Sequence, residues 1–416
     1  MAQMHPLLAR QPIFDRNMGV VAYELLYRAS LDNHAAVTDG NTASTQVLLN
    51  AFTELSVEKV VGQHRAFINF TGDLMDARLP FDTSQLVVEV LESEAIDSNL
   101  LHRLKTLREN GFAIALDDFE ITEESEPLLA YADIVKLDVL ALSEQQLVTH
   151  IQQLKNLGIQ VLAEKIETFE MLEQCKAMGC DMFQGYFLER PAIIEGHRLN
   201  ESKQAVLQLL AKLNEANVAF TDVEEIISRD PVLSFKLLRL VNSAAFGLPR
   251  TIESLRQALT LLGLKIIKNW IGLLAMAKLG DKPAELSAQA LTRAKLCELM
   301  AAQTRPESQC DTFFTAGLLS MLDAFMDSPL ESVLAEIQLS EELKAALLDY
   351  SGEEGNFLRT VIHYEHGEWN AIDWDYLKTK DLDPGSLSTL YLQTLCWVDE
   401  TQRAIQAEVQ TLPIKP

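Results

Sequence analysis

The sequence has few cysteines, no long apolar run and far fewer basic than acidic residues. Its five cysteines are odd in number and none belongs to a C-x-x-C pair, which argues against a disulfide framework or a zinc ribbon and fits a reducing cytoplasm. No apolar run approaches the roughly 20 residues of a membrane span, and the first residues lack a basic stretch followed by an apolar core. We therefore expect a soluble, cytoplasmic protein with no membrane partner.

The shortage of basic residues also limits the partners. Sixty acidic residues against thirty-five basic ones give a net charge of -25. Non-specific binding to nucleic acid depends on Lys and Arg neutralising phosphates, so we do not expect it here. A small anionic ligand remains compatible with this charge if metal ions and a few well-placed cations receive it. The 416 residues are enough for two or three domains.

An apolar run of strand length, which begins at Phe112, stops at two adjacent carboxylates, Asp117 and Asp118. Such a run is typical of a strand buried on both faces, as in a parallel sheet covered by helices. Adjacent carboxylates repel each other unless a cation, a proton or a firm donor lies between them, which favours a divalent metal with oxygen ligands. Taken alone, such a pair is more often a solvated or capping turn at the end of a strand than a metal site.

From residue 7 to about 190, short apolar runs alternate with amphipathic stretches. Helices are expected from about 42 to 55, 98 to 110, 143 to 157 and 168 to 178. Glycine follows each of the last three, at Gly111, Gly158 and Gly179, where it can supply a left-handed cap. Alternation of strands and helices predicts parallel strands, and hence a closed (β/α) barrel of the TIM type with its active site at the strand ends.

The predicted strands repeatedly end in polar residues, so seven strand ends would converge on one mouth. These residues are Glu24, Asn69, Glu89, Asp117, Lys136, Glu164 and Gln184. Oxygen ligands without Cys or His select hard cations such as Mg²⁺ or Mn²⁺. Two such ions sharing Asp117 and Asp118 would suit hydrolysis of a phosphodiester, with Arg28 and Lys136 holding phosphate charge.

Residues from about 5 to 195 resemble the EAL family of cyclic di-GMP phosphodiesterases. The family's E-x-L-x-R motif stands here as Glu24 to Arg28, with Leu25 in place of alanine, and its asparagine strand end stands as Asn69. Its E-x-T-E motif stands as Glu89 to Glu92 and its D-D-F motif as Asp117 to Phe119. Its K-x-D motif stands as Lys136 to Asp138 and its Q-G-Y motif as Gln184 to Tyr186. The resemblance implies a barrel that hydrolyses cyclic di-GMP to linear pGpG with Mg²⁺ or Mn²⁺. It also implies that two copies of the chain can form a homodimer through this domain.

The same resemblance assigns roles to individual residues. The first metal would be held by Glu24, Asn69, Glu89 and Asp117, with Asp118 shared with a second metal. Lys136, Glu164 and Glu167 would be catalytic, Arg28 and Gln184 would bind the substrate, and Glu92 would support the loop that follows Asp118.

The chain departs from the family pattern at two places. The family's D-D-F-G-x-G-x-S loop is replaced by an acidic segment without glycine, Glu120 to Glu126, and its E-G-V-E segment has Lys165 in place of glycine. Because the family's loop uses glycine at positive φ, we expect the altered loop to hold Asp118 poorly and a second metal to bind weakly. These departures leave a second hypothesis open, in which a catalytically degenerate barrel serves as a cyclic di-GMP receptor or a protein-interaction scaffold.

From about residue 198 the strand patterns give way to helical periods, which predicts a barrel domain over residues 1–198 and an all-α domain over 199–416. The segment from Asp230 to Gly263 is similar to the HDOD family, which is related to the metal-dependent HD phosphohydrolases. None of the eight histidines is followed by Asp, so an HD metal site is not indicated. We expect this half to be a signal-output module or a module that binds a protein partner.

Overall fold

The computed structural model describes residues 7–28, 60–70, 72–76, 83–91, 95–185, 201–213, 218–228, 231–243, 246, 248, 252, 254–276, 284–306, 309–326, 328–337 and 339–406. The chain divides into two compact units. The first holds Met1–Ala192 together with His363–Ile372 and Asp383–Ser388, and the second holds the remaining residues. The boundary predicted near residue 198 falls outside the described residues and stays a prediction.

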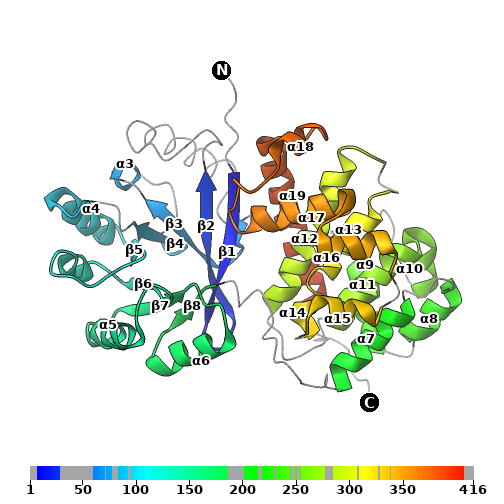
Figure 1. Ribbon diagram of the computed structural model, residues 1–416, viewed down its shortest axis with the longest axis horizontal. Helices are drawn as coiled ribbons and strands as arrows, with labels where there is room; N and C mark the ends of the chain where they lie inside the picture. Colours follow the sequence, from blue (N-terminus) through cyan, green and yellow to red (C-terminus); the bar gives the residue numbers. More distant parts are fainter. Residues whose placement is uncertain are drawn as a thin grey trace, which may run out of the picture. The chain divides into compact units, whose positions relative to one another are not determined.

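The first unit is a closed eight-stranded barrel (Figure 1), which confirms the predicted fold class. Its strands, which follow one another around the barrel in chain order, are β1 (Leu7–Asp15), β2 (Val20–Arg28), β3 (Arg65–Phe70), β4 (Leu86–Val90), β5 (Ala113–Leu116), β6 (Ile134–Asp138), β7 (Gln160–Glu164) and β8 (Met182–Phe183). Strands β2 to β8 are parallel, so their carboxyl ends meet at one mouth.

Strand β1 was not predicted, and it runs antiparallel to both of its neighbours, β2 and β8. A tight turn joins it to β2: Oδ1 of Asp15 accepts hydrogen bonds from the amides of Asn17 and Gly19, each at 2.8 Å, and Met18 has φ +64°. So short a connection can join only antiparallel strands, because a parallel pair needs a crossover of a dozen or more residues. The sequence analysis, which looked for strands separated by helices, therefore counted seven strands where the barrel has eight.

The helices that follow the strands of the barrel lie outside it (Figure 1). They are α3 (Gly72–Met75), α4 (Ser98–Glu109), the 3-10 helix η1 (Glu126–Ala130), α5 (Glu144–Asn156) and α6 (Phe169–Met178). The side chains of Asp97, Ser143 and Thr168 cap the amino ends of α4, α5 and α6 by accepting backbone hydrogen bonds. Three of the four predicted helices are thereby confirmed, and the one expected from 42 to 55 lies outside the described residues.

One apolar layer fills the barrel interior. Each of the eight strands contributes one buried residue to it, in chain order Ile13, Ala22, Phe67, Val87, Ala115, Ile134, Leu162 and Met182. Packing one side chain from every strand into a single layer excludes water from the axis. This layer is the floor on which any site at the carboxyl ends of the strands must be built.

The rest of the described chain is helical, as predicted. Its helices are α7 (Glu201–Leu213), α8 (Phe220–Ser228), α9 (Pro231–Val241), α10 (Leu255–Leu262), α11 (Leu264–Met276), α12 (Ala284–Ala302), α13 (Asp311–Leu319), α14 (Leu322–Met326), α15 (Leu330–Ala335), α16 (Glu341–Asp349), α17 (Gly352–Glu365), α18 (Trp374–Lys378) and α19 (Pro384–Gln406). The aromatic rings of Trp270, Phe314 and Trp397 contact one another inside the second unit. In the described part of the chain, no helix combines the length and the apolar character that crossing a membrane requires.

Candidate active site

Seven of the predicted site residues form a second layer, directly above the apolar floor. In each strand from β2 to β8 the site residue follows the floor residue by two positions, giving Glu24, Asn69, Glu89, Asp117, Lys136, Glu164 and Gln184. Side chains alternate between the two faces of a strand, so residues two apart point to the same side. The spacing therefore sends all seven side chains into the mouth of the barrel.

The ammonium group of Lys136 lies at the centre of this layer. Its Nζ is 2.7 Å from Oδ1 of Asp117, 2.8 Å from Oε1 of Glu89, 2.9 Å from Oε1 of Glu164 and 3.2 Å from Oε2 of Glu24. The Lys136 side chain is only 1% exposed. Four carboxylates from four different strands are thus arranged around one buried positive charge, a set we call the carboxylate cage.

Gln184 ties the cage to strand β1. Its Nε2 donates a hydrogen bond to Oε2 of Glu24 at 2.8 Å and another to Oε1 of Gln11 at 3.2 Å. Because β1 runs antiparallel, Gln11 reaches this layer by preceding the floor residue Ile13 by two positions instead of following it. The sequence analysis missed Gln11, although its spacing from Ile13 carried the signal once β1 was recognised as a strand.

Burial and mutual repulsion perturb the ionisation of the cage. Burial, followed by the charge of Glu24, raises the pKa of Glu89 well above its ordinary value. Burial also raises the pKa of Glu164 to about 7, although Lys136 opposes the shift. Burial alone would lower the pKa of Lys136, but the surrounding carboxylates, Glu89 first, raise it well above the usual value. The lysine is therefore charged at neutral pH, while the cage retains proton-binding capacity.

The cage offers the donors of a hard-cation site. Buried Oδ1 of Asn69 and both carboxylate oxygens of Glu89 accept no hydrogen bond from the described residues, although Lys136 faces Glu89 as an ion pair. As they stand, no three His, Cys, Asp or Glu side chains of the described residues are arranged to hold a metal ion. The point on which the carboxylates converge is taken by the Lys136 ammonium. Carboxylate and amide oxygens are donors that suit a hard divalent cation.

The remaining predicted residues lie apart from the cage. Asp118 follows Asp117 with φ +46°, and its side chain is 48% exposed. Arg28, the last residue of β2, donates from an Nη atom to Oδ1 of Asn370 at 2.7 Å. Glu167 is exposed beyond the end of β7. Glu92 lies outside the described residues, so its predicted support of the loop stays a prediction.

Comparison with known proteins assigns both halves of the chain. Residues 7–191 match the model of the EAL domain and residues 199–351 that of the HDOD domain. The uncharacterized protein YuxH of Bacillus subtilis is 36% identical over 406 residues, covering 95% of this chain and 98% of that protein. Cyclic di-GMP phosphodiesterase CdgJ of Vibrio cholerae is 30% identical over 372 residues, covering 88% and 86%. The chain belongs to the EAL-HDOD family.

A solved structure similar to part of this EAL-HDOD protein is the manganese and cyclic di-GMP complex of Klebsiella pneumoniae BlrP1. It is 22% identical in sequence, covers 45% of this chain and 56% of that one, and superimposes with a TM-score of 0.37.

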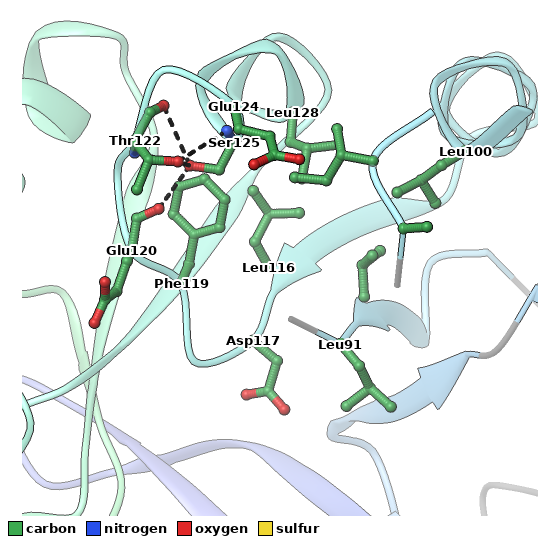
Figure 2. Close-up of a pocket in the computed structure, with 13 residues that line it drawn as sticks. Leu91, Leu100, Leu116, Asp117, Phe119, Glu120, Thr122, Glu124, Ser125 and Leu128 are labelled. Atoms are coloured by element: carbon green, nitrogen blue, oxygen red, sulfur yellow. Dashed lines mark hydrogen bonds between the residues drawn. The ribbon is translucent and has the colours of Figure 1, made fainter. Parts of the chain in front are cut away.

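The loop after Asp118 is held together by hydrogen bonds among its own residues, and its predicted effect on Asp118 and on a second metal stays a prediction. Oγ of Ser125 donates to the carbonyl of Glu120 at 2.6 Å, the Thr122 amide donates to Oγ of Ser125 at 2.9 Å, and the Ser125 amide donates to Oγ1 of Thr122 at 3.1 Å (Figure 2). No residue from Phe119 to Glu126 has a positive φ. The hydroxyl side chains hold the turn by bonding to its backbone, and the loop needs no residue at positive φ.

The same loop lines a cavity of about 290 Å³. Leu100, Leu116, Phe119 and Leu128 form much of its wall, and Asp117 lies at its edge (Figure 2). The buried ring of Phe119 anchors the loop just beyond the Asp pair. This packing gives the acidic segment a fixed position at the mouth of the barrel.

The raised pKa of Glu164 predicts a pH-dependent stability of the metal-free protein. Folding favours its protonated form, so this contribution is complete below a pH of about 4.5 and is lost as the pH rises through about 7. A shift of this size corresponds to about 3 kcal/mol of unfolding free energy. Denaturant unfolding in EDTA should show that Glu164→Gln becomes more stable relative to the wild type between pH 5 and pH 8. Parallel stability curves for the two proteins would contradict the shift.

Proposed function

We propose that this EAL-HDOD protein hydrolyses cyclic di-GMP to linear pGpG at the mouth of its barrel, with Mg²⁺ or Mn²⁺. The observation that carries the proposal is the carboxylate cage, in which Glu24, Glu89, Asp117 and Glu164 surround a single cation position next to the amide oxygen of Asn69. CdgJ, which aligns with most of the chain, is named a cyclic di-GMP phosphodiesterase. The HDOD half would transmit the signal or bind a protein partner, and a homodimer through the barrel belongs to the same proposal.

The cage residues divide into ligands and groups that handle charge and protons. Glu24, Asn69, Glu89 and Asp117 would hold the metal, which when bound polarises the phosphoryl group and makes water a better nucleophile near neutral pH. Glu164, with a pKa of about 7, can accept a proton from the attacking water. Lys136, 2.9 Å from Glu164, keeps its charge and can stabilise negative charge on phosphate oxygens.

Three further residues would recognise the substrate or assist the reaction. Nε2 of Gln184 is engaged within the cage, but its Oε1 is buried and accepts no hydrogen bond from the described residues, so it can accept one from a ligand. Arg28 at the end of β2 would hold a phosphate of the dinucleotide, exchanging its hydrogen bond with Asn370 for a charge-assisted one. Exposed Glu167 would act at the edge of the site, close to Glu164.

A receptor without turnover is the second candidate function, and the position of Lys136 favours it, because the ammonium already fills the point that a metal would take. Two assays on the full-length protein separate the candidates. One is the formation of pGpG from cyclic di-GMP with Mn²⁺, and the other is calorimetric binding of cyclic di-GMP with Ca²⁺ as a metal that supports binding. Turnover supports the enzyme, binding without turnover supports the receptor, and neither would contradict both.

Replacing Glu24 should abolish hydrolysis without unfolding the chain. Glu24 is one of four like charges around Lys136, so Glu24→Ala removes a metal ligand while relieving repulsion within the cage. We expect a loss of turnover of at least about 100-fold and a melting temperature close to that of the wild type. The control is Glu173→Ala, which removes a surface carboxylate that pairs with Lys176. A large fall in melting temperature with activity retained per folded molecule would make Glu24 structural.

A further inference from the structure

Two non-glycine residues with left-handed backbones lie at the ends of β5 and β7, the strands on either side of β6. Lys165, which directly follows β7, has φ +57°, and Asp118, which lies just beyond β5, has φ +46°. Such conformations are strained for residues with a side chain and persist only where the surroundings enforce them. Glycine would adopt this φ without strain, whereas a lysine adopts it at a cost. The lysine at this position therefore calls for a functional explanation.

The side chain of Lys165 is clamped in one place. Its Nζ lies 2.6 Å from Oδ2 of Asp138, at the end of β6 between the two strained residues. Asp138 is itself fixed, because its Oδ1 accepts hydrogen bonds from the amides of Leu140 at 2.8 Å and Ala141 at 3.2 Å. From this anchor the ammonium faces Asp118, with 3.6 Å between Nζ and Oδ1. Three successive strand ends, β5, β6 and β7, thus cooperate to hold one positive charge beside Asp118.

The Lys165 ammonium lies beside Asp118, the carboxylate expected to bind a second metal. An ammonium about 4 Å from a divalent ion would weaken binding of the ion by about 30-fold even with the screening of bulk water. Asp118 is half exposed and has no other cation within ion-pair distance in the described part of the chain. The cage sets four carboxylates against one ammonium, whereas Asp118 is a single carboxylate that faces one, so its surroundings fit a divalent ion less well.

We infer that the Lys165 ammonium stands in place of a second divalent cation, so that the barrel binds one metal ion per chain. The lysine then supplies fixed positive charge on the side of the mouth where Asp118 lies. This inference rests on the proposed function and deepens it by assigning the number of metals and the residue that replaces one of them. It also explains the predicted weak binding of a second metal by the charge of Lys165 and not by the loop after Asp118, which is held together by hydrogen bonds.

The test counts the Mn²⁺ ions bound by the full-length protein without substrate. Equilibrium dialysis with metal analysis would be applied to the wild type and to Lys165→Met and Lys165→Gly, the second of which also removes the backbone strain. Lys155→Met is the matched control, since Lys155 is similarly exposed and pairs at 2.6 Å with Asp181, whose Oδ2 accepts the Val161 amide. It removes the same charge at the opposite, amino-terminal end of β8, where Asp181 precedes Met182.

We expect one Mn²⁺ for the wild type and for Lys155→Met. Both Lys165 variants should bind a second ion at least about 30-fold more tightly than the wild type does. A wild type that binds two ions with affinities within tenfold of each other would overturn the inference, as would Lys165 variants that stay at one. Glu89→Gln separates a failure of this inference from a failure of the proposed function, because it should remove only the first ion, which the carboxylate cage holds. A wild type that binds no Mn²⁺ would contradict the proposed function itself.

Discussion

Lys136→Met is expected to reduce turnover of cyclic di-GMP by about 100-fold to 10,000-fold and to lower the melting temperature of the metal-free protein by about 10 °C. The loss of turnover follows from removing the positive charge that contacts all four carboxylates of the cage. The loss of stability follows because breaking a buried ion pair leaves uncompensated charge, at a cost of about 3–5 kcal/mol. Turnover and thermal unfolding in EDTA measure the two effects separately.

Metal addition distinguishes this explanation from a general packing defect. If Mn²⁺ replaces the missing ammonium, it should raise the melting temperature of Lys136→Met by more than that of the wild type. Lys155→Met serves as the control here as well, since its ion pair with Asp181 is partly exposed and is worth about 0–1 kcal/mol. Should Lys136→Met match this control in both turnover and melting temperature, Lys136 would have no central role in the cage.

Gly185→Ala should have the second large effect, because the backbone of Gly185 leaves no room for a side chain. A Cβ at this position would lie 2.2 Å from the amide nitrogen and 2.4 Å from the carbonyl oxygen of Ile166, and φ is +155°. The end of β8 would have to move away from β7, carrying Gln184 away from Glu24. We expect a loss of about 3 kcal/mol in unfolding free energy and at least about a tenfold loss of turnover, measured by denaturant unfolding and by pGpG formation.

A second glycine isolates the contribution of this contact. Gly158 also has a positive φ, +76°, but a Cβ there meets no atom within 4 Å. Gly158→Ala should therefore cost only the backbone strain, about 1 kcal/mol, and leave turnover unchanged. If the two substitutions destabilised the protein equally, the close approach of Gly185 to Ile166 would not be what positions Gln184.

Much of the barrel could be predicted because strand periodicity and strand ends are local properties of the sequence. The apolar run before Asp117 implied a buried strand, and the two-residue spacing from floor to site follows from the alternation of side chains. The helix ends could be predicted as well, since Ser143 and Thr168 cap the helices that were predicted from those positions. The family motifs then located the same residues independently.

What could not be predicted depends on contacts between distant parts of the chain. The position of Lys136 among four carboxylates needs the closed barrel, and its approach to Glu24 spans 112 residues of sequence. The hydrogen bond from Arg28 to Asn370 spans 342 residues. Strand β1 was missed because its connection to β2 is a tight turn, and the missing strand concealed Gln11. The hydrogen bonds between Thr122 and Ser125 that hold the loop after Asp118 were not foreseen either.

The central claim is that the carboxylate cage is the metal-dependent centre of a cyclic di-GMP phosphodiesterase. Glu89 is its most buried carboxylate, with no exposed surface. The most direct measurement is therefore the initial rate of pGpG formation with Mn²⁺ by the wild type and by Glu89→Gln, each shown to be folded by circular dichroism. The account predicts that the wild type forms pGpG, that EDTA stops it, and that Glu89→Gln is slower by at least about 100-fold. Absence of pGpG from the wild type, or an equal rate for Glu89→Gln, would contradict it.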